Sequence, residues 1–252
     1  MALSSETDRF RANYAAHRAR EGRAHSGAEL SSLPYLEHGP LVRQWRVRAC
    51  SFEAFLAKVV WPMERDRPLD ILDLGAGNGW LSYRLAMRGH RCTAVDIRDD
   101  AVDGLGAAAE LRRLMRFDIV AASFDDLPVP DASADIAVFN ASLHYAVDLA
   151  ATLAEAMRCV RSGGCVAVLD SPFYARAADG EAMVREKRSM PGLAALDCIE
   201  FLTRKRLAEA SDLPWARHRV RYPPWYELRP LTARLRGARR PSRFDLWTAQ
   251  LP

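Results

Sequence analysis

Three glycines stand within five positions in the stretch Gly75-Ala-Gly-Asn-Gly79, directly after the aliphatic run Leu69–Leu74. Glycine allows positive φ angles and lets another molecule approach the main chain without meeting a Cβ atom. Gly75 and Gly77 are the two positions where we expect that freedom to be needed. Because ligands of doubly wound sheets bind beyond the carboxyl ends of the strands, this pattern predicts a ligand held against bare backbone.

A carboxylate follows at a separation that fits such a ligand. Asp96 ends the run Arg91–Asp96, about 20 residues beyond Gly75, which is the separation at which an acid reaches a ribose. Its carboxylate can accept hydrogen bonds from both ribose hydroxyls. A strand-end aspartate taken alone is usually a cap or turn former, but together with the glycine loop it favours a nucleoside ligand.

The loop matches neither of the two common phosphate motifs. A dinucleotide fingerprint, G-x-G-x-x-G, would require glycine where Trp80 stands. A phosphate-cradling loop would require Gly-Lys-Ser/Thr, which is absent. A tight turn without any ligand remains the plain alternative, although it does not account for Asp96.

The elements that must position these residues follow from the alternation of the chain. Short aliphatic runs alternate with helical segments, and the runs are Leu69–Leu74, Arg91–Asp96, Phe117–Ser123, Asp135–Phe139 and Cys165–Asp170. This alternation predicts an α/β fold with a doubly wound, mostly parallel sheet and helices on both faces. Two later runs, Trp215–Tyr222 and Phe244–Gln250, predict an antiparallel C-terminal edge and bring the sheet to seven strands.

Helices are predicted by three- and four-residue spacing and by their end signals. An apolar stripe that runs from Val42 to Trp61-Pro62 predicts one long helix, and we interpret residues 1–66 as an N-terminal helical lid. Residues 67–252 would form the ligand-binding domain, with 172–252 as a C-terminal embellishment. Further helices are expected at Trp80–Arg88, at Leu149–Val160 before the turn Arg161–Gly164, and at Thr203–Ala210 with Thr203 as its cap.

Composition narrows the possible partners. The formal charge is only +4, from 36 basic and 32 acidic residues, without a long block of like charge, so we expect no nucleic-acid partner. The five cysteines are widely spaced with no C-x-x-C pair, so we expect no metal site and reduced thiols in a cytoplasmic protein. No apolar run approaches the ~20 residues of a membrane helix, so we expect no membrane association. The oligomeric state stays open.

The ordered motifs resemble a known family. Asp73-x-Gly75-x-Gly77-x-Gly79, Asp96, Asp126-Leu-Pro128, Asp135-Ile-Ala-Val-Phe-Asn140 and Arg161-Ser-Gly-Gly164 are similar to those of the class I S-adenosylmethionine-dependent methyltransferases. Within that family the chain resembles the bacterial small-molecule branch, which methylates quinone precursors, sterols and natural products. The resemblance covers about residues 68–171. It implies a Rossmann-like fold, S-adenosyl-L-methionine as cofactor and a small-molecule methyl acceptor.

The resemblance also implies which residues contact the cofactor. Its methionine end would lie against a group at the end of the first strand: Asp73, Gly75, Ala76, Gly77 and Asn78. Asp96 would hold the ribose hydroxyls and Ile97 would lie against the adenine face. Family members often place an acid at the end of the third strand, where this chain has Ser123 and Phe124, so Asp125 is an alternative partner for the adenine. Asn140 and Ala141 would lie near the sulfonium.

Residues around the predicted methyl acceptor have two interpretations each. His144 follows the fourth strand, where a neutral imidazole could act as general base; it could equally pack or hydrogen-bond in the loop. Tyr145 has the same two interpretations. Phe173 and Tyr174 follow the fifth strand and either wall the acceptor pocket or cover the core. Oxygen is favoured as the acceptor atom only because of His144.

Other features and rival functions stay open. Tyr14, Tyr35, Trp45 and Arg46 are candidates to meet the cofactor or acceptor, although for Trp45 we favour anchoring the long helix to the sheet. Tyr222-Pro-Pro-Trp225 lies too far along the chain for a base-gripping signature and predicts a rigid turn. Arg236, Arg239, Arg240 and Arg243 form either a solvated face or an acidic-substrate site. The rival functions are a nicotinamide-dependent oxidoreductase, a non-catalytic nucleoside-binding protein and an RNA or protein methyltransferase.

Overall fold

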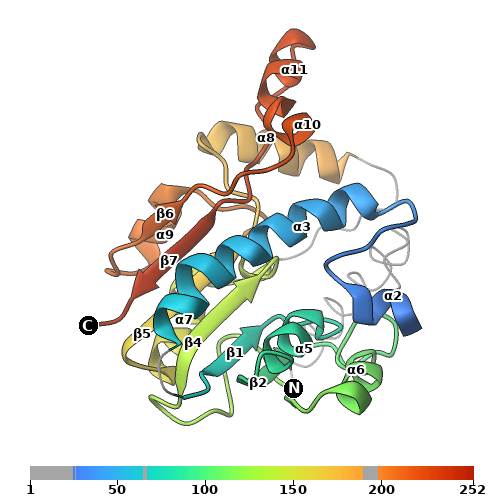
Figure 1. The fold of residues 1–252 in the computed structure, drawn as a ribbon. Helices are drawn as coiled ribbons and strands as arrows, with labels where there is room; N and C mark the ends of the chain where they lie inside the picture. Colours follow the sequence, from blue (N-terminus) through green and yellow to red (C-terminus); the bar gives the residue numbers. More distant parts are fainter. Residues whose placement is uncertain (1–24, 26, 65–66, 190–197) are drawn as a thin grey trace.

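A seven-stranded sheet with helices on both faces forms the centre of the protein (Figure 1). The computed structural model describes residue 25 and residues 27–64, 67–189 and 198–252. The strand order is β3-β2-β1-β4-β5-β7-β6. The strands are β1 (Asp70–Leu74), β2 (Arg91–Asp96), β3 (Asp118–Ala121), β4 (Ala134–Asn140), β5 (Val160–Leu169), β6 (Ala216–His218) and β7 (Leu246–Gln250).

The topology is that of a doubly wound sheet with a reversed edge. The first five strands are parallel, and β7 pairs antiparallel with both β5 and β6. The chain starts in the middle with β1, runs outward to β3, and then returns to place β4 on the other side of β1. Strand order therefore reverses between β1 and β4, which is where such sheets bind ligands. The predicted fold class, including the antiparallel C-terminal edge, is confirmed.

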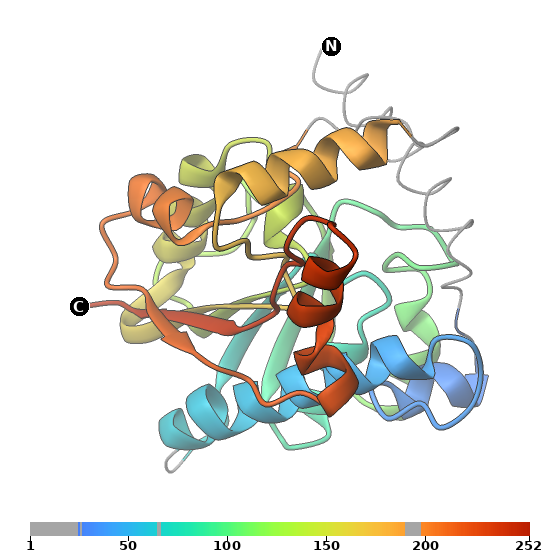
Figure 2. The same cartoon turned by 90° about the horizontal axis from the view of Figure 1, so that it is seen from above.

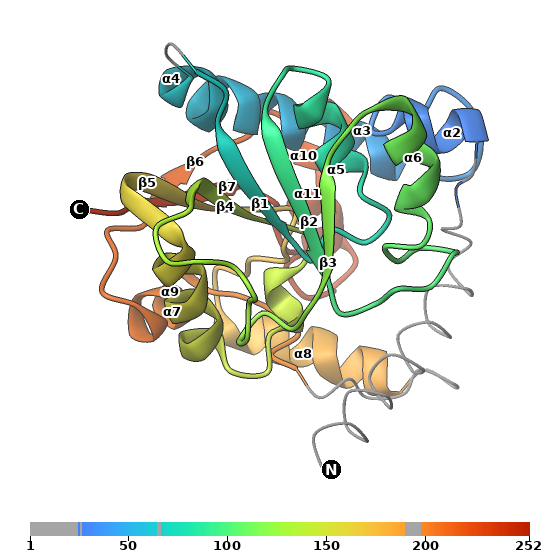
Figure 3. The ribbon, with the colours of Figure 1, turned by 90° about the horizontal axis from the view of Figure 1, so that it is seen from below.

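Helices and short helical turns cover both faces of the sheet. They are α2 (Gly27–Ser32), α3 (Val42–Phe55), the π-helical turn η1 (Leu56–Val60), α4 (Trp61–Met63), α5 (Trp80–Ala86), α6 (Ala108–Leu114), the 3₁₀ turn η2 (Leu143–Tyr145), α7 (Leu149–Cys159), α8 (Ala177–Arg188), α9 (Arg204–Ala210), α10 (Pro224–Glu227) and α11 (Arg229–Leu235). Helices α3, α5 and α6 lie on one side of the sheet, and α7, α8 and α9 lie on the other (Figures 2 and 3).

Alternating side chains of each central strand supply two separate cores. Ile71 in β1 belongs to the core beneath α3 and α5, whereas Leu72 and Leu74 belong to the core beneath α7. Since successive side chains of a strand point to opposite faces, one aliphatic strand can serve both cores. All seven residues of β4 are buried, as expected for the central strand of a sheet covered on both faces.

The long N-terminal helix predicted from the apolar stripe is present. α3, η1 and α4 follow one another without a break from Val42 to Met63, and α3 lies across the sheet (Figure 1). Trp45 and Phe52 of α3 hold Trp80 of α5 between them, with ring centroids 5.7 and 5.6 Å away. Trp45 therefore packs this helix against α5. The lid interpretation of residues 1–66 stays a prediction, and Tyr14 lies outside the described residues.

Two parts of the fold differ from the sequence-based expectation. The segment Arg161–Gly164 is not a turn ahead of a strand but lies inside β5. Between the pairs Ala134–Val160 and Ile136–Cys165, β5 contains extra residues that bulge out of register with β4. Gly163 has φ +75°, a value that the bulge accommodates because glycine has no Cβ. In addition, α6, α8, α10 and α11 were not predicted.

Candidate functional site

The glycine loop between β1 and α5 has the backbone conformation that its sequence predicts. Gly75, Gly77 and Gly79 have φ angles of 77°, 54° and 76°, all in the left-handed region. The backbone amides of Gly75 and Ala76 both donate to the carbonyl oxygen of Val95 in β2, at 2.8 and 3.0 Å. The loop is thus tied to the end of the neighbouring strand in a conformation that other residues adopt only with strain.

Protein atoms already occupy the space beside these glycines where a Cβ would project. A Cβ on Gly75 would overlap the side chain of Ser142, which follows β4, and one on Gly77 would lie 3.2 Å from the carbonyl oxygen of Asp103. A Cβ on Gly79 would lie 3.0 Å from the Cβ of Ala108. The sequence argument for close approach holds, but at these three positions the approaching atoms belong to the protein itself.

Asp96 and the glycine loop, which lie 19 residues apart, meet in the structure. The Oδ2 atom of Asp96 accepts a hydrogen bond from the amide of Gly77 at 2.8 Å, and Oδ1 accepts one from the amide of Arg98 at 2.9 Å. Burial raises the pKa of Asp96, and these two amide hydrogen bonds oppose the rise. The carboxylate therefore lies beside the glycine loop, and its contact with a ribose stays a prediction.

Asp73 lies on the inner side of the same loop. It is fully buried in β1, and its Oδ2 atom accepts hydrogen bonds from the hydroxyl and the amide of Ser82 in α5, at 2.9 and 3.2 Å. Burial raises the pKa of Asp73 to about 7, and the hydrogen bonds from Ser82 limit that rise. This carboxyl group changes its charge within the physiological pH range.

Two of the oxygen atoms that are buried and unpartnered among the described residues at this edge of the sheet, one on β1 and one on β4, indicate what kind of ligand the edge fits. Oδ1 of Asp73 and Oδ1 of Asn140 have no hydrogen-bond partner among the residues that the structure describes. Buried polar atoms in proteins nearly always have a partner. Asp73 and Asn140 lie on β1 and β4, on either side of the point where the strand order reverses. The edge therefore fits a ligand that donates hydrogen bonds, such as one with an ammonium group.

The other residues predicted to contact the cofactor make contacts mainly with residues close to them in the chain. The Oδ1 atom of Asn78 accepts from the amide of Trp80, the first residue of α5, at 3.3 Å. The Trp80 ring is buried among aromatic rings of α3, so it lies in the core. Ile97, the residue after Asp96, is half-buried. The hydroxyl of Ser123 donates to Asp125 at 2.5 Å, and Phe124 contacts Phe139 edge-on at 5.7 Å.

The segment after β4 turns back over the end of β1. Ala141 has φ +56°, a strained value for a residue with a Cβ, and its amide donates to Leu169 in β5 at 2.8 Å. The hydroxyl of Ser142 donates to the carbonyl of Leu74 in β1 at 2.5 Å. Strain of this kind is common where a chain is fixed beside a binding site. The turn thereby places the residues that follow at the carboxyl edge of the sheet.

His144 lies in η2, directly beyond this turn. Its Nδ1 atom is 3.3 Å from the hydroxyl oxygen of Ser171, and its ring centroid is 4.1 Å from that of Tyr145. Ser171 follows β5, so the histidine links the segments that leave the two strands. The imidazole is thus oriented by a hydroxyl and a neighbouring ring, an arrangement that suits either a positioned base or a packing residue.

Phe173 and Tyr174, the two aromatic candidates after β5, are both buried. Phe173 stacks on Trp247 of β7 with ring centroids 4.8 Å apart. Tyr174 packs edge-on against Phe201 at 5.8 Å, and its hydroxyl oxygen accepts from Arg239 at 3.2 Å. Their contacts are those of packing residues, and lining of an acceptor pocket by either ring stays a prediction.

Asp170 is a buried carboxyl group at this edge that sequence reasoning did not select. It directly follows β5, has φ +53°, and its Oδ1 atom accepts from the hydroxyl of Ser51 in α3 at 2.5 Å. Within the described residues, its Oδ2 atom and the hydroxyl of Tyr226 have no hydrogen-bond partner. Burial raises the pKa of both groups, that of Tyr226 to about 12. The only sequence signal was an acid at the end of an aliphatic run.

The described part of the chain contains neither a cluster of metal ligands nor a membrane-spanning helix. Among residues 25, 27–64, 67–189 and 198–252, no three His, Cys, Asp or Glu side chains come together in a way that could hold a metal ion. Within the same ranges, no helix has the length and apolar character needed to cross a bilayer.

Comparison with known proteins identifies the central part of the chain. Residues 72–168 match the family model described as a methyltransferase domain. The chain is 32% identical over 134 residues to dimethylglycine N-methyltransferase of Parasynechococcus marenigrum, an alignment that covers 50% of this chain and 46% of that protein. It is 32% identical over 96 residues to malonyl-[acyl-carrier protein] O-methyltransferase of Serratia marcescens, covering 38% and 36%. The chain thus matches less than half the length of these curated relatives.

Solved structures share the fold with low sequence identity. The YcgJ protein of Bacillus subtilis superposes with a TM-score of 0.59 at 14% identity, covering 80% of this chain and 97% of that one. A geranyl diphosphate methyltransferase in complex with GPP and sinefungin gives a TM-score of 0.59 at 16% identity, covering 82% and 80%. The strand order and these solved structures show the Rossmann-like fold that the sequence predicted, and within it residues 72–168 are similar to a methyltransferase domain.

Proposed function

We propose that this protein binds S-adenosylmethionine at the carboxyl ends of β1, β2 and β4 and transfers its methyl group to a small-molecule acceptor. The observation that carries the proposal is the hydrogen bond between Asp96 and Gly77, which lies beside the strand-order reversal of a matched methyltransferase domain. The methyltransferase relatives support the reaction type. Their names include both an oxygen and a nitrogen methyltransferase, so the acceptor atom stays open.

The residues at this edge suit the donor groups of the cofactor. S-adenosylmethionine carries an ammonium group, two ribose hydroxyls and an adenine amino group, all of which donate hydrogen bonds. The unpartnered oxygens of Asp73 and Asn140 would accept from the methionine end, together with Gly75, Ala76, Gly77, Asn78 and Ala141. Asp96 would accept from the ribose, with Ile97 against the adenine face and Ser123 and Phe124 at its edge.

The protein's part in methyl transfer is mainly to hold and to align. The cofactor supplies a methyl group that is already activated by positively charged sulfur. The chain's own residues must bring the acceptor atom into line with that methyl group and exclude water. We propose that His144 takes up the acceptor's proton where the acceptor is not already deprotonated, with Ser171 orienting the imidazole. In this arrangement Tyr145, Phe173 and Tyr174 border the acceptor.

A cytoplasmic location fits the cysteine chemistry of the chain. Cys50, Cys92, Cys159 and Cys165 are free thiols. Secreted proteins of this size commonly use their cysteines in disulfides, whereas reducing compartments keep thiols free. We therefore propose that the protein works in the cytoplasm.

Turnover on a panel of metabolites tests the proposed reaction. The protein is incubated with S-adenosylmethionine and one candidate acceptor at a time, and release of S-adenosylhomocysteine is measured. We expect acceptor-dependent release with the unaltered chain and none with the Asp96→Ala variant. A chain that binds the cofactor but releases no product with any hydroxyl, amine or carbon acid would instead be the non-catalytic nucleoside-binding protein.

A further inference from the structure

A pocket of about 450 Å³ lies in the C-terminal part of the protein and is lined by four arginines, Arg217, Arg219, Arg240 and Arg243. Arg217 is in β6 and Arg219 follows that strand, whereas Arg240 and Arg243 lie in the connection from α11 to β7. Pairing of β6 with β7 therefore brings together two chain segments that are more than 20 residues apart.

The pocket lies at the same edge of the sheet as the proposed cofactor site. β6 runs parallel to β5, because both are antiparallel to β7, so the residue after β6 and the residues before β7 lie at the carboxyl edge. The connection is direct at Arg243, whose backbone amide and carbonyl both hydrogen-bond to Phe173, at 2.9 and 3.1 Å. Phe173 is the fourth residue after β5 and a candidate neighbour of the acceptor.

Strand spacing sets the distance between the two sites. β6 is three positions from β4 in the order β4-β5-β7-β6. Neighbouring strands lie roughly 4.8 Å apart, so the pocket is on the order of 14 Å along the edge from the end of β4. An acceptor methylated beside β1 and β4 could place a distant part of itself in the pocket.

Positive charge in the pocket exceeds the negative charge beside it. Asp245 accepts from Arg217 at 2.8 Å and lies 3.4 Å from Arg243. Glu227 pairs with Arg243 at 2.9 Å and with Arg219 at 3.5 Å. Two carboxylates thus pair with three of the four arginines. The guanidinium of Arg240 forms no ion pair with any described residue, since only its backbone amide contacts Asp179.

The surrounding sequence adds to this excess. From Pro214 to Arg243 the chain contains nine arginines and one acidic residue, Glu227. A solvated basic face would explain such a composition, but it would not explain why four arginine side chains line one pocket. Asp245 is only 2% exposed, so it fixes Arg217 and Arg243 at the wall of the pocket before any ligand arrives. Guanidinium groups fixed in this way bind phosphate or carboxylate oxygens in pairs.

We propose that the arginine pocket binds an anionic group, a phosphate or a carboxylate, at the far end of the methyl acceptor; this inference rests on the proposed methyltransferase function. The acceptor is then an elongated anion, with its methylated atom and its charged group separated by on the order of 14 Å. An acceptor with both groups close together cannot bridge the two sites. The pocket therefore selects substrates by length as well as by charge.

Titration with simple anions tests the pocket without any knowledge of the acceptor. Inorganic phosphate and, in a separate series, succinate are titrated into the full chain at constant ionic strength. We expect saturable binding of one anion per chain, and at least about 10-fold weaker binding in Arg240→Gln, because one charge-assisted contact is lost. Arg240→Gln leaves the pairs of Asp245 and Glu227 intact.

The matched control is Arg234→Gln, which removes the same charge from an exposed position on α11 outside the pocket. Anion binding should stay unchanged in this variant. The inference is overturned if neither anion binds saturably, or if both variants weaken binding equally, since that is the behaviour of a diffuse basic surface. Preference for phosphate or for succinate identifies which anion the pocket takes.

Cofactor binding separates failure of this inference from failure of the proposed function. S-adenosylmethionine is titrated into the same three proteins, and we expect equal affinities because the pocket does not touch the cofactor loop. If the cofactor binds but the anions do not, only the pocket assignment is wrong. If the anions bind but the cofactor does not, the proposed function is wrong. With an elongated phosphorylated acceptor and its neutral counterpart, Arg240→Gln should raise KM for the anionic one alone.

Discussion

Two carboxyl groups lie near the glycine loop, that of Asp73 in β1 and that of Asp96 at the end of β2, and they differ in what they can still bind. Asp96 uses both oxygens on backbone amides, at 2.8 and 2.9 Å, yet carboxylate oxygens can each accept a second hydrogen bond. Asp73 has one oxygen that is buried and unpartnered among the described residues. Asp96 can therefore shape the loop before the cofactor arrives, whereas Asp73 gains a partner only when a donor enters.

Replacing Asp96 tests the ribose assignment. We expect Asp96→Ala to weaken S-adenosylmethionine binding by about 100-fold or more, because two hydrogen bonds to a carboxylate are each worth about 1.5–3 kcal/mol. Isothermal titration calorimetry measures the change. Asp99→Ala is the matched control, since it removes the same charge from an exposed position three residues away. Equal affinities in both variants would remove Asp96 from the cofactor site.

Asp73 should make the stability of the cofactor-free protein depend on pH. Its pKa is raised to about 7 in the folded protein and is near 3.8 when the chain unfolds, so the folded state binds the additional proton between these values. Its contribution to stability is therefore complete below about pH 4 and is lost as the pH rises through about 7. The slope is up to about 1.4 kcal/mol per pH unit.

Urea denaturation from pH 5 to 8 measures this slope, with Asp73→Asn as the comparison. The amide does not titrate, so the free energy of unfolding of the variant should fall less steeply with rising pH. Parallel curves for the two proteins would show that Asp73 does not carry the raised pKa.

Binding of S-adenosylmethionine to the unaltered chain should tighten as the pH rises through about 7, because ionised Asp73 attracts the cofactor's ammonium group.

Replacing His144 distinguishes the role of a general base from that of a packing residue. If it is the general base, His144→Ala should lower kcat by roughly 100-fold while cofactor affinity changes little. The loss should shrink at high pH, where the acceptor ionises without help. His38→Ala, an exposed histidine in the loop before α3, serves as the control. A normal kcat with reduced thermal stability would return His144 to a packing role beside Tyr145 and Ser171.

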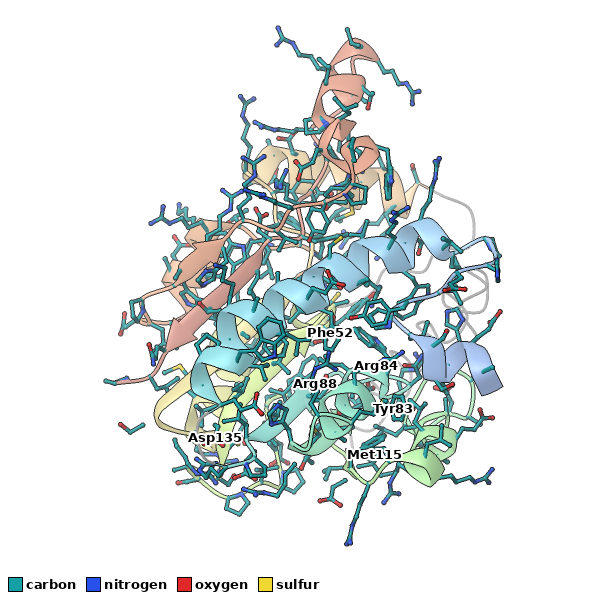
Figure 4. All side chains as sticks on the ribbon, in the orientation of Figure 1. Phe52, Tyr83, Arg84, Arg88, Met115 and Asp135 are labelled. Carbon is teal, nitrogen blue, oxygen red and sulfur yellow. The ribbon has the colours of Figure 1, made fainter. Side chains whose placement is uncertain are left out.

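At the scale of the elements, an aromatic contact between α3 and α5 holds the end of the glycine loop in place. Trp80 starts α5 directly after the glycine loop and is buried against Trp45 and Phe52. The guanidinium of Arg88 lies over the ring of Phe52 at 5.3 Å, and the two residues are neighbours in Figure 4. The packing of α3 against α5 thus also holds the end of the glycine loop.

Truncating that ring tests how much the contact contributes. Trp80→Ala should lower the free energy of unfolding by about 3–5 kcal/mol, the usual cost of removing a large buried aromatic side chain. Trp61→Ala, whose side chain is 56% exposed, should cost less than about 1 kcal/mol. Chemical denaturation measures both. A loss for Trp80→Ala no larger than that for Trp61→Ala would mean that the loop is held by its hydrogen bonds alone.

Elements with a strong apolar pattern were predictable from the sequence, and polar elements were not. Strand β2 has the predicted bounds, Arg91–Asp96. Helix α9 begins one residue later than predicted, because Thr203 is its cap, and the Thr203 hydroxyl accepts from the amide of Arg206. Helix α8 buries only Gly180 and therefore has no apolar periodicity. It is held by ion pairs from Lys187 and Arg188 to Glu200, which lies outside the helix, 13 and 12 residues further along the chain.

The same distinction applies to the candidate site. The proximity of Asp96 and the glycine loop followed from the sequence because parallel neighbouring strands end at one edge. The buried Asp170 and the arginine pocket depend on contacts between segments far apart in the chain, such as that of Asp170 with Ser51. The sequence did show a group of arginines near the C-terminus, but only the pairing of β6 with β7 brings Arg217 and Arg219 to it.

In the proposed function, the cofactor and acceptor sites share the carboxyl edge of the sheet, whereas the contacts described at the amino edge are structural. At the amino edge, burial disfavours ionisation of Asp135, but hydrogen bonds from Arg67, the amide of Asp70 and Arg161 bring its pKa down to about 2. This cluster stabilises the starts of β1 and β4. Helix α11 projects beyond the carboxyl edge, on the side of the arginine pocket (Figure 1).

Titration of the unaltered chain with S-adenosylmethionine, S-adenosylhomocysteine and NAD in parallel tests the central claim most directly. A site built from the glycine loop, Asp96 and Asp73 should bind one molecule per chain of each of the first two compounds. NAD should bind far more weakly, since Trp80 stands where a dinucleotide loop requires its third glycine. Tight binding of NAD, or no binding of either adenosyl compound, would contradict the account.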